Sequence, residues 1–131
     1  MEAGFGFKRL KVWGKAIEFA DRIIGLAESL ASERKHFRLV EQLEAAASSV
    51  AQNIAEGKGR YSKKEFIRHL YIARGSLYEV ITLLNLFRTR NWITEEQLIA
   101  AESEGLEIAR MLKGLINSLF DEGSEKHLTE K

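Results

Sequence analysis

The sequence predicts an all-α protein that folds as an antiparallel up-down four-helix bundle. Apolar residues recur at steps of three and four over four long stretches, short polar breaks separate these stretches, and no alternating strand pattern competes. Helices joined by short loops pack antiparallel to their neighbours. We expect a single bundle domain over residues 1–120 and a flexible polar tail over residues 121–131.

The first two expected helices cover about residues 10–31 and 37–56, with the polar stretch SERKH between them. Their apolar stripes are Trp13, Ala16, Ala20, Ile23, Ala27 and Leu30 in the first, and Val40, Leu43, Ala47, Val50 and Ile54 in the second. Gly57 and Gly59 follow, and they predict the end of the second helix because glycine adopts left-handed dihedral angles at little cost.

Capping signals open the other two helices. Ser62 and Glu65 form the Ser-x-x-Glu pattern of a capping box, in which the hydroxyl caps the first turn and the carboxylate reaches back. The apolar stripe that follows runs to Phe87. Thr94 and Gln97 repeat the capping pattern before the fourth helix, whose apolar rhythm continues to Leu119.

Composition excludes several classes of protein. The 131 residues include no cysteine, which excludes structural disulfides, thiolate zinc sites and cysteine nucleophiles. No apolar stretch approaches the roughly 20 residues of a membrane span, and no signal peptide is recognisable at the N-terminus. We therefore expect a soluble, cytoplasmic protein without membrane contacts.

The sequence contains no recognisable catalytic or metal-binding motif. Glu65 and His69 share a helix face, but two ligands are too few for a metal site. The GKGR segment lacks the Gly-Lys-Ser/Thr ending of a phosphate-binding loop. We expect no enzymatic activity, no cofactor and no bound metal.

The charges are segregated along the chain, although the formal net charge is only +1. Residues 57–90 carry eight Lys and Arg against two Glu, and residues 91–131 carry four against nine acidic residues. An up-down bundle places the start of its first helix beside the turn between its second and third helices. The basic residues that we expect at this end to bind nucleic acid, with RNA favoured, are Lys11, Lys15, Lys58, Arg60, Lys63, Lys64 and Arg68.

Tyr61 lies within this basic turn and offers a stacking surface for an unpaired base. Two alternatives stay open for the turn. It could be an ordinary solvated loop, or the basic and acidic helices could neutralise each other inside one bundle.

A polar stripe runs beside the apolar one along the second helix and continues on the third. If the hairpin turns near residue 60, Gln42 faces Glu79 and Ser49 faces Ile72. We interpret the stripe as a hydrogen-bonded seam that fixes the helix register, with a polar groove as the alternative. The seam residues are Gln42, Ser49, Asn53, Glu56, Ser76 and Glu79.

The third helix carries more apolar surface than one packed face requires. Residues 77–87 contain a single charge, Glu79. A helix in an isolated bundle needs only one covered face, so this surplus predicts contacts between subunits. The expected interface residues are Tyr78, Ile81, Leu83 and Leu86. Alternatively, Phe5, Phe7 and Trp92 fold over this face within one chain.

Three segments resemble one known family. They are FKRLKVWGKAIEFA at 7–20, LVEQLEAAASSVAQNIAEGKGR at 39–60 and SKKEFIRHLYIARGSLYEVITLL at 62–84, and the most specific parts are residues 53–57 and 75–79. The chain is similar there to the S23 family, four-helix-bundle proteins encoded within intervening sequences of bacterial 23S rRNA genes. That family is related to the accessory variability proteins of diversity-generating retroelements.

The resemblance covers about residues 7–119 and implies several properties. It implies an up-down bundle that assembles as a homopentamer, without known catalysis, and with a nucleic acid or a reverse transcriptase as partner. The family often has prolines before and within the second helix, where this chain reads ERKHF and SVAQN. Ala51 in the second segment predicts an unkinked helix.

Together these observations predict a non-enzymatic homo-oligomeric scaffold. Its basic surface would bind nucleic acid or an RNA-associated protein such as a reverse transcriptase. The alternative is a protein–protein adaptor that binds no nucleic acid.

Overall fold

The computed structural model describes the backbone of residues 4–31 and 36–129, and the side chains of residues 4–30 and 36–122. Within these residues all regular structure is helical. A short 3₁₀ helix, η1 (Gly6–Arg9), precedes α1 (Lys11–Ala31), α2 (Phe37–Lys58), α3 (Lys63–Thr89) and α4 (Glu95–Thr129). The predicted fold class, an all-α four-helix bundle, is confirmed.

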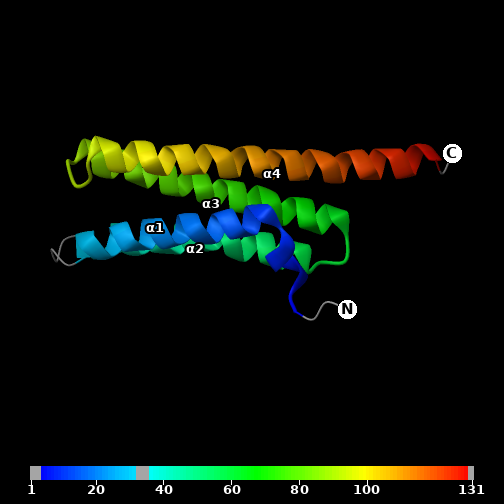
Figure 1. Cartoon of the computed structure of the whole chain (residues 1–131), viewed down its shortest axis with the longest axis horizontal. Coiled ribbons are helices and arrows are strands. Elements are labelled where there is room, and N and C mark those ends of the chain that lie inside the picture. The colour runs from blue at the N-terminus through cyan, green and yellow to red at the C-terminus, as the bar shows by residue number, and fades with distance from the viewer. Residues whose placement is uncertain (1–3, 32–35, 130–131) are drawn as a thin grey trace.

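The four helices run side by side in alternating directions (Figure 1). Their contacts place them in chain order around a square. Each packs against its neighbours in the sequence, and α4 closes the square against α1. The start of α1, the α2–α3 turn and the end of α4 lie at one end of the bundle, which is the right-hand end in Figure 1. This arrangement brings segments far apart in the sequence to one place.

The last helix is longer than its apolar pattern suggests. The backbone of α4 is helical to Thr129 and extends past the α2–α3 turn (Figure 1). The segment 121–131, expected to be a flexible polar tail, thus begins as a continuation of α4. Its flexibility stays a prediction.

The predicted apolar stripes form the core. Side chains from all four helices are almost completely buried, and the bulkiest of them are Phe19, Ile23, Leu43, Ile54, Leu70, Leu77, Leu84, Phe87, Ile108 and Leu112. Burying each of these side chains contributes on the order of 1.5–3 kcal/mol relative to exposure. This core holds the two ends of the bundle in fixed positions.

The capping predictions differ in detail. Thr94 Oγ1 accepts from the Gln97 N–H at 3.1 Å while Gln97 Oε1 accepts from the Thr94 N–H at 2.8 Å, which completes a reciprocal capping box. Ser62 Oγ likewise accepts from the Glu65 N–H at 3.1 Å. The Glu65 carboxylate, however, lies 3.8 Å from Arg68 Nε instead of reaching back.

The glycines at the end of α2 act differently from the expectation. Gly57 lies inside α2, and Gly59 has a φ of −80°, so neither supplies a left-handed stop. Gly57 is buried, and a Cβ added there would lie 2.7 Å from the Cβ of His69 and 3.0 Å from a ring carbon of Phe66. Because Gly57 has no side chain, α2 and α3 can approach closely just before the turn.

The apolar residues are distributed as stripes and not as one continuous run. No helix among the described residues combines the length and hydropathy that a membrane-spanning segment requires.

Candidate nucleic-acid interface

The basic residues predicted from the sequence meet at one end of the bundle. Lys11 is the first residue of α1, and Lys63 is the first residue of α3. Both helices begin at the right-hand end in Figure 1, beside the turn that carries Lys58 and Arg60. Lys15 lies about one helical turn into α1, and Arg68 lies more than one turn into α3.

Several of these cations have acidic partners. The four pairs are Arg60 with Glu56 at 2.6 Å, Lys63 with Glu122 at 2.8 Å, Lys15 with Glu107 at 3.4 Å and Arg68 with Glu65 at 3.8 Å. All are solvent-exposed pairs, and such pairs contribute between 0 and about 1 kcal/mol. A phosphate can therefore replace the carboxylate at small cost.

The other three predicted cations, Lys11, Lys58 and Lys64, are exposed and form no ion pair with any side chain that the structure describes. The Lys58 ammonium lies 6.0 Å from the centroid of the Phe66 ring, which places it beside the first turn of α3. Among the predicted cations, these three lysines carry positive charge that no described carboxylate compensates.

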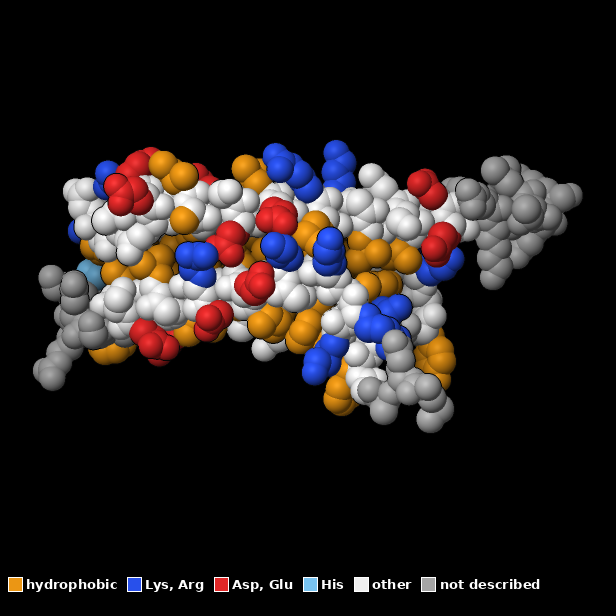
Figure 2. Space-filling view, in the orientation of Figure 1, with side chains coloured by type: hydrophobic (Ala, Val, Ile, Leu, Met, Phe, Trp, Pro, Cys, Tyr) orange, Lys and Arg blue, Asp and Glu red, His pale blue; other side chains and the backbone are white. Residues whose placement is uncertain are grey.

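Sequence reasoning missed the specific acidic residues of α4 that reach this region. Glu107 and Glu122 come from the acidic part of the chain and pair with cations of α1 and α3. Figure 2 shows basic and acidic side chains interspersed where α1 and α4 lie side by side. Acidic residues of the same chain thus neutralise four of the predicted cations and leave the other three without an acidic partner among the described residues.

Tyr61 occupies the turn between α2 and α3. Its relative exposure is 110%, so its ring packs against nothing in the described chain. The turn itself is held by backbone hydrogen bonds from the Gly59 N–H to the Ala55 carbonyl at 3.3 Å and from the Arg60 N–H to the Gly57 carbonyl at 3.1 Å. The ring therefore projects from a turn whose backbone is held by hydrogen bonds.

A polar seam does join α2 and α3, with a different membership from the prediction. The Oγ atoms of Ser49 and Ser76 lie 2.8 Å apart, and Asn53 Nδ2 donates to both the Oγ and the carbonyl of Ser49 at 3.0 Å. Asn53 Oδ1 lies 3.2 Å from Nδ1 of His69, which is 4% exposed. Because an amide oxygen only accepts, His69 Nδ1 carries the proton.

The predicted seam register is wrong at Ser49, whose partner lies four residues further along α3 than expected. Ser49 faces Ser76 and not Ile72, which is exposed. The hairpin turn itself lies near residue 60 as predicted, between the end of α2 at Lys58 and the start of α3 at Lys63. Sequence reasoning also missed His69, whose burial follows from its close contact with Gly57.

The remaining predicted seam residues lie outside the seam. Gln42, Glu56 and Glu79 are all exposed, and Glu56 pairs with Arg60. Gln42 and Glu79 therefore lack the buried contact that was expected between them.

The predicted subunit-contact residues of α3 divide into two groups. Tyr78 and Leu86 are 54% and 44% exposed, and Ile81 is half-buried. Leu83 is only 8% exposed because it packs into the core of its own chain, so its assignment to an exposed face was wrong.

The aromatic residues considered as a cover for this face lie elsewhere. Phe7 packs against Trp13 of α1, with ring centroids 5.2 Å apart, and Phe5 stacks on Phe7. Trp92 contacts Phe87 near the opposite end. These three residues therefore do not cover the exposed face of α3.

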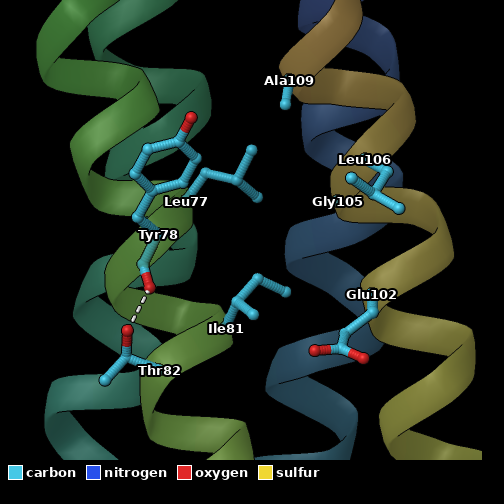
Figure 3. A pocket seen from close by; sticks show the side chains of 8 residues that line it. All are labelled: Leu77, Tyr78, Ile81, Thr82, Glu102, Gly105, Leu106 and Ala109. Atoms are coloured by element: carbon cyan, nitrogen blue, oxygen red, sulfur yellow. Dashed lines mark hydrogen bonds between the residues drawn. The ribbon is translucent and has the colours of Figure 1, made fainter.

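A groove of about 520 Å³ lies between α3 and α4 (Figure 3). Tyr78 and Ile81 project from α3, and Leu106, which is 56% exposed, projects from α4 on the other side. Gly105 also lines the groove and has no side chain that would fill it. A Cβ added at Gly105 would lie 3.2 Å from the end of the Ile81 side chain. Sequence reasoning identified the α3 side of this groove and missed Leu106.

A second apolar groove, of about 490 Å³, lies between α1 and α2. Phe7, Trp13 and Ile17 line it together with small residues of α2. Because the helices follow one another around a square, this groove and the α3–α4 groove lie on opposite sides of the bundle. These two grooves are separate apolar surfaces of the described chain outside its core.

These features define the class of protein: a four-helix bundle with a basic end and two apolar grooves. A family model described as 23S rRNA-intervening sequence protein matches residues 8–114. The chain belongs to this family, and the resemblance drawn from the sequence is confirmed.

A solved structure agrees with this assignment. It is the crystal structure of a protein with unknown function from the S23 ribosomal protein family of Bacteroides thetaiotaomicron. The two chains are 32% identical with a TM-score of 0.77, and the match covers 80% of this chain and 97% of that chain. Comparison with curated proteins gives no match.

Proposed function

We propose that the protein is a non-enzymatic homo-oligomeric scaffold whose basic end binds RNA. The observation that carries this proposal is the cluster of cations at the α2–α3 turn and the start of α1. Within it, Lys11, Lys58 and Lys64 lack acidic partners in the described chain. Uncompensated lysines gain affinity for a phosphate backbone by releasing its counterions.

The family description supports RNA as the nucleic acid to test first, because it refers to an intervening sequence of 23S rRNA. The exposed pairs of Arg60 and Lys63 with carboxylates add further cations that phosphate can recruit. Repetition of this end around an oligomer would strengthen weak single contacts through multivalency.

Self-association is supported by the two apolar grooves. Tyr78 and Leu106 at one groove, and Phe7 and Ile17 at the other, expose apolar surface that water solvates poorly. Contacts between different surfaces of neighbouring copies can cover both grooves in a closed ring. The resemblance implies that such a ring contains five copies.

The α3–α4 groove also favours a second candidate function, an adaptor that captures a protein and binds no nucleic acid. A reverse transcriptase is the partner that the resemblance implies for a protein contact. Binding that survives high salt would favour the adaptor, because apolar contacts are not screened as charges are.

The test is an RNA gel-shift assay on a variant with Lys58, Arg60, Lys63 and Lys64 all changed to Gln. We expect this variant to fold normally and to lose RNA retention, because four cations at the turn are removed. A matched control removes four exposed cations elsewhere, Arg38, Arg90, Arg110 and Lys113.

Both variants have the same net charge, so the control separates the location of the charges from their number. The control should retain RNA. Retention by the turn variant, or equal loss in both variants, would refute the proposed site.

A further inference from the structure

The three tyrosines of the chain differ in how their ring faces are covered. Arg74 places its guanidinium 4.8 Å from the ring centroid of Tyr71 and 5.8 Å from that of Tyr78. Tyr61 has no such neighbour among the described residues, and its exposure is 110%. Among the tyrosines, Tyr61 is therefore the ring whose faces are free for a ligand.

Packing gives no reason for an aromatic residue at this position. The ring contributes nothing to the core, and exposing it to water costs free energy that a polar residue would avoid. The turn around it is nevertheless ordered on both sides: the Gly59 N–H bonds back into α2, and Ser62 caps α3. A ring held out on an ordered turn is preorganised for stacking.

The surrounding charges match the backbone of a nucleic acid strand. Lys58 and Lys64 lie three residues before and three residues after Tyr61, and neither has a carboxylate partner in the described chain. Grooves that bind single strands combine such cations with an aromatic ring on which a base stacks.

We propose that this end binds single-stranded nucleic acid with one unpaired base stacked on the ring of Tyr61. This inference rests on the proposed function and specifies the ligand of the same site. A base in a duplex is already stacked between its neighbours, and extracting it costs a few kcal/mol. The site therefore discriminates in favour of a single strand.

The experiment measures the affinity of the full chain for a labelled, unstructured RNA of about eight nucleotides, within the site size of known single-strand binders. A blunt duplex of the same length is titrated in parallel. The variants are Tyr61→Ala and Tyr61→Phe, and Tyr71→Ala is the matched control, because Tyr71 is also exposed but is covered by Arg74.

We expect Tyr61→Ala to weaken single-strand binding roughly 5- to 150-fold, the range found for removing one base-stacking aromatic. Tyr61→Phe keeps the ring and should bind within about twofold of the wild type, as should Tyr71→Ala. Duplex binding, which uses the lysines alone, should be weaker than single-strand binding in the wild type and unchanged by Tyr61→Ala.

The outcomes separate this inference from the proposed function. Wild-type protein that binds neither RNA overturns both. RNA binding that Tyr61→Ala leaves unchanged, or a wild type that binds the duplex as tightly as the single strand, overturns the stacking proposal and leaves the basic surface standing.

Discussion

The two interfaces of α3 are built differently. Against α2, small and polar residues let the helices approach closely: Gly57 packs on His69, and Ser49 bonds to Ser76. Against α4, the bulky side chains of Tyr78 and Leu106 project outward and border a groove. The first interface fixes the hairpin that carries the basic turn, and the second leaves apolar surface available to another chain.

The largest expected effect comes from disturbing the close interface. Gly57→Ala would place a Cβ 2.7 Å from the Cβ of His69, an atom fixed to the backbone of α3. Overpacking of this kind costs about 1–3 kcal/mol, which outweighs the gain in helix propensity of up to about 1 kcal/mol. Chemical denaturation should show the loss directly.

Gly105→Ala is the matched control at the other interface. Its Cβ would come closest to the flexible end of Ile81, at 3.2 Å, so a small rotation of that side chain relieves the contact. We expect a change within about 1 kcal/mol, of either sign. Equal destabilisation by the two glycine substitutions would remove the distinction between the interfaces.

A smaller effect on folding is expected from Leu106→Glu in the groove. Leu106 is 56% exposed, so the free energy of unfolding of a single chain should change by less than about 1 kcal/mol. A charge buried between copies is costly, however, and should dissociate the oligomer. Static light scattering gives the mass of each protein, and a wild-type monomer would contradict self-association.

The smallest expected effect is that of Glu79→Ala. As a member of a buried seam, Glu79 would have stabilised the hairpin, but the structure places it on the surface. Substitutions at exposed positions usually change stability by no more than about 0.5 kcal/mol. The melting temperature should stay within about 2 °C of the wild type, and a larger drop would restore Glu79 to a structural role.

The fold could be predicted because the three- and four-residue rhythm determines which face of each helix is buried. The gathering of cations at one end followed from the same topology, since up-down connections place the start of the first helix beside the second turn. These conclusions require only the alternating direction of the helices and the spacing of their apolar residues. Both follow from local patterns in the sequence.

The finer features of the site depend on where each helix lies along the length of its neighbour. The pairing of Lys63 with Glu122 requires the longitudinal position of α4, which its own pattern does not specify. The Ser49–Ser76 contact likewise requires the position of α2 along α3. The burial of Leu83 depends on the neighbouring helices and could not be separated from the exposure of Leu86 by hydropathy.

The most direct test of the central claim is the salt dependence of RNA binding by the wild-type protein. Each phosphate neutralised on a single strand contributes a slope of about −0.7 to log affinity against log salt. Engagement of Lys11, Lys58 and Lys64 alone predicts a slope of about −2 per chain, and recruitment of the paired cations makes it steeper. Absence of RNA binding, or an affinity that does not change with salt, would contradict the assignment of this end as a phosphate-binding surface.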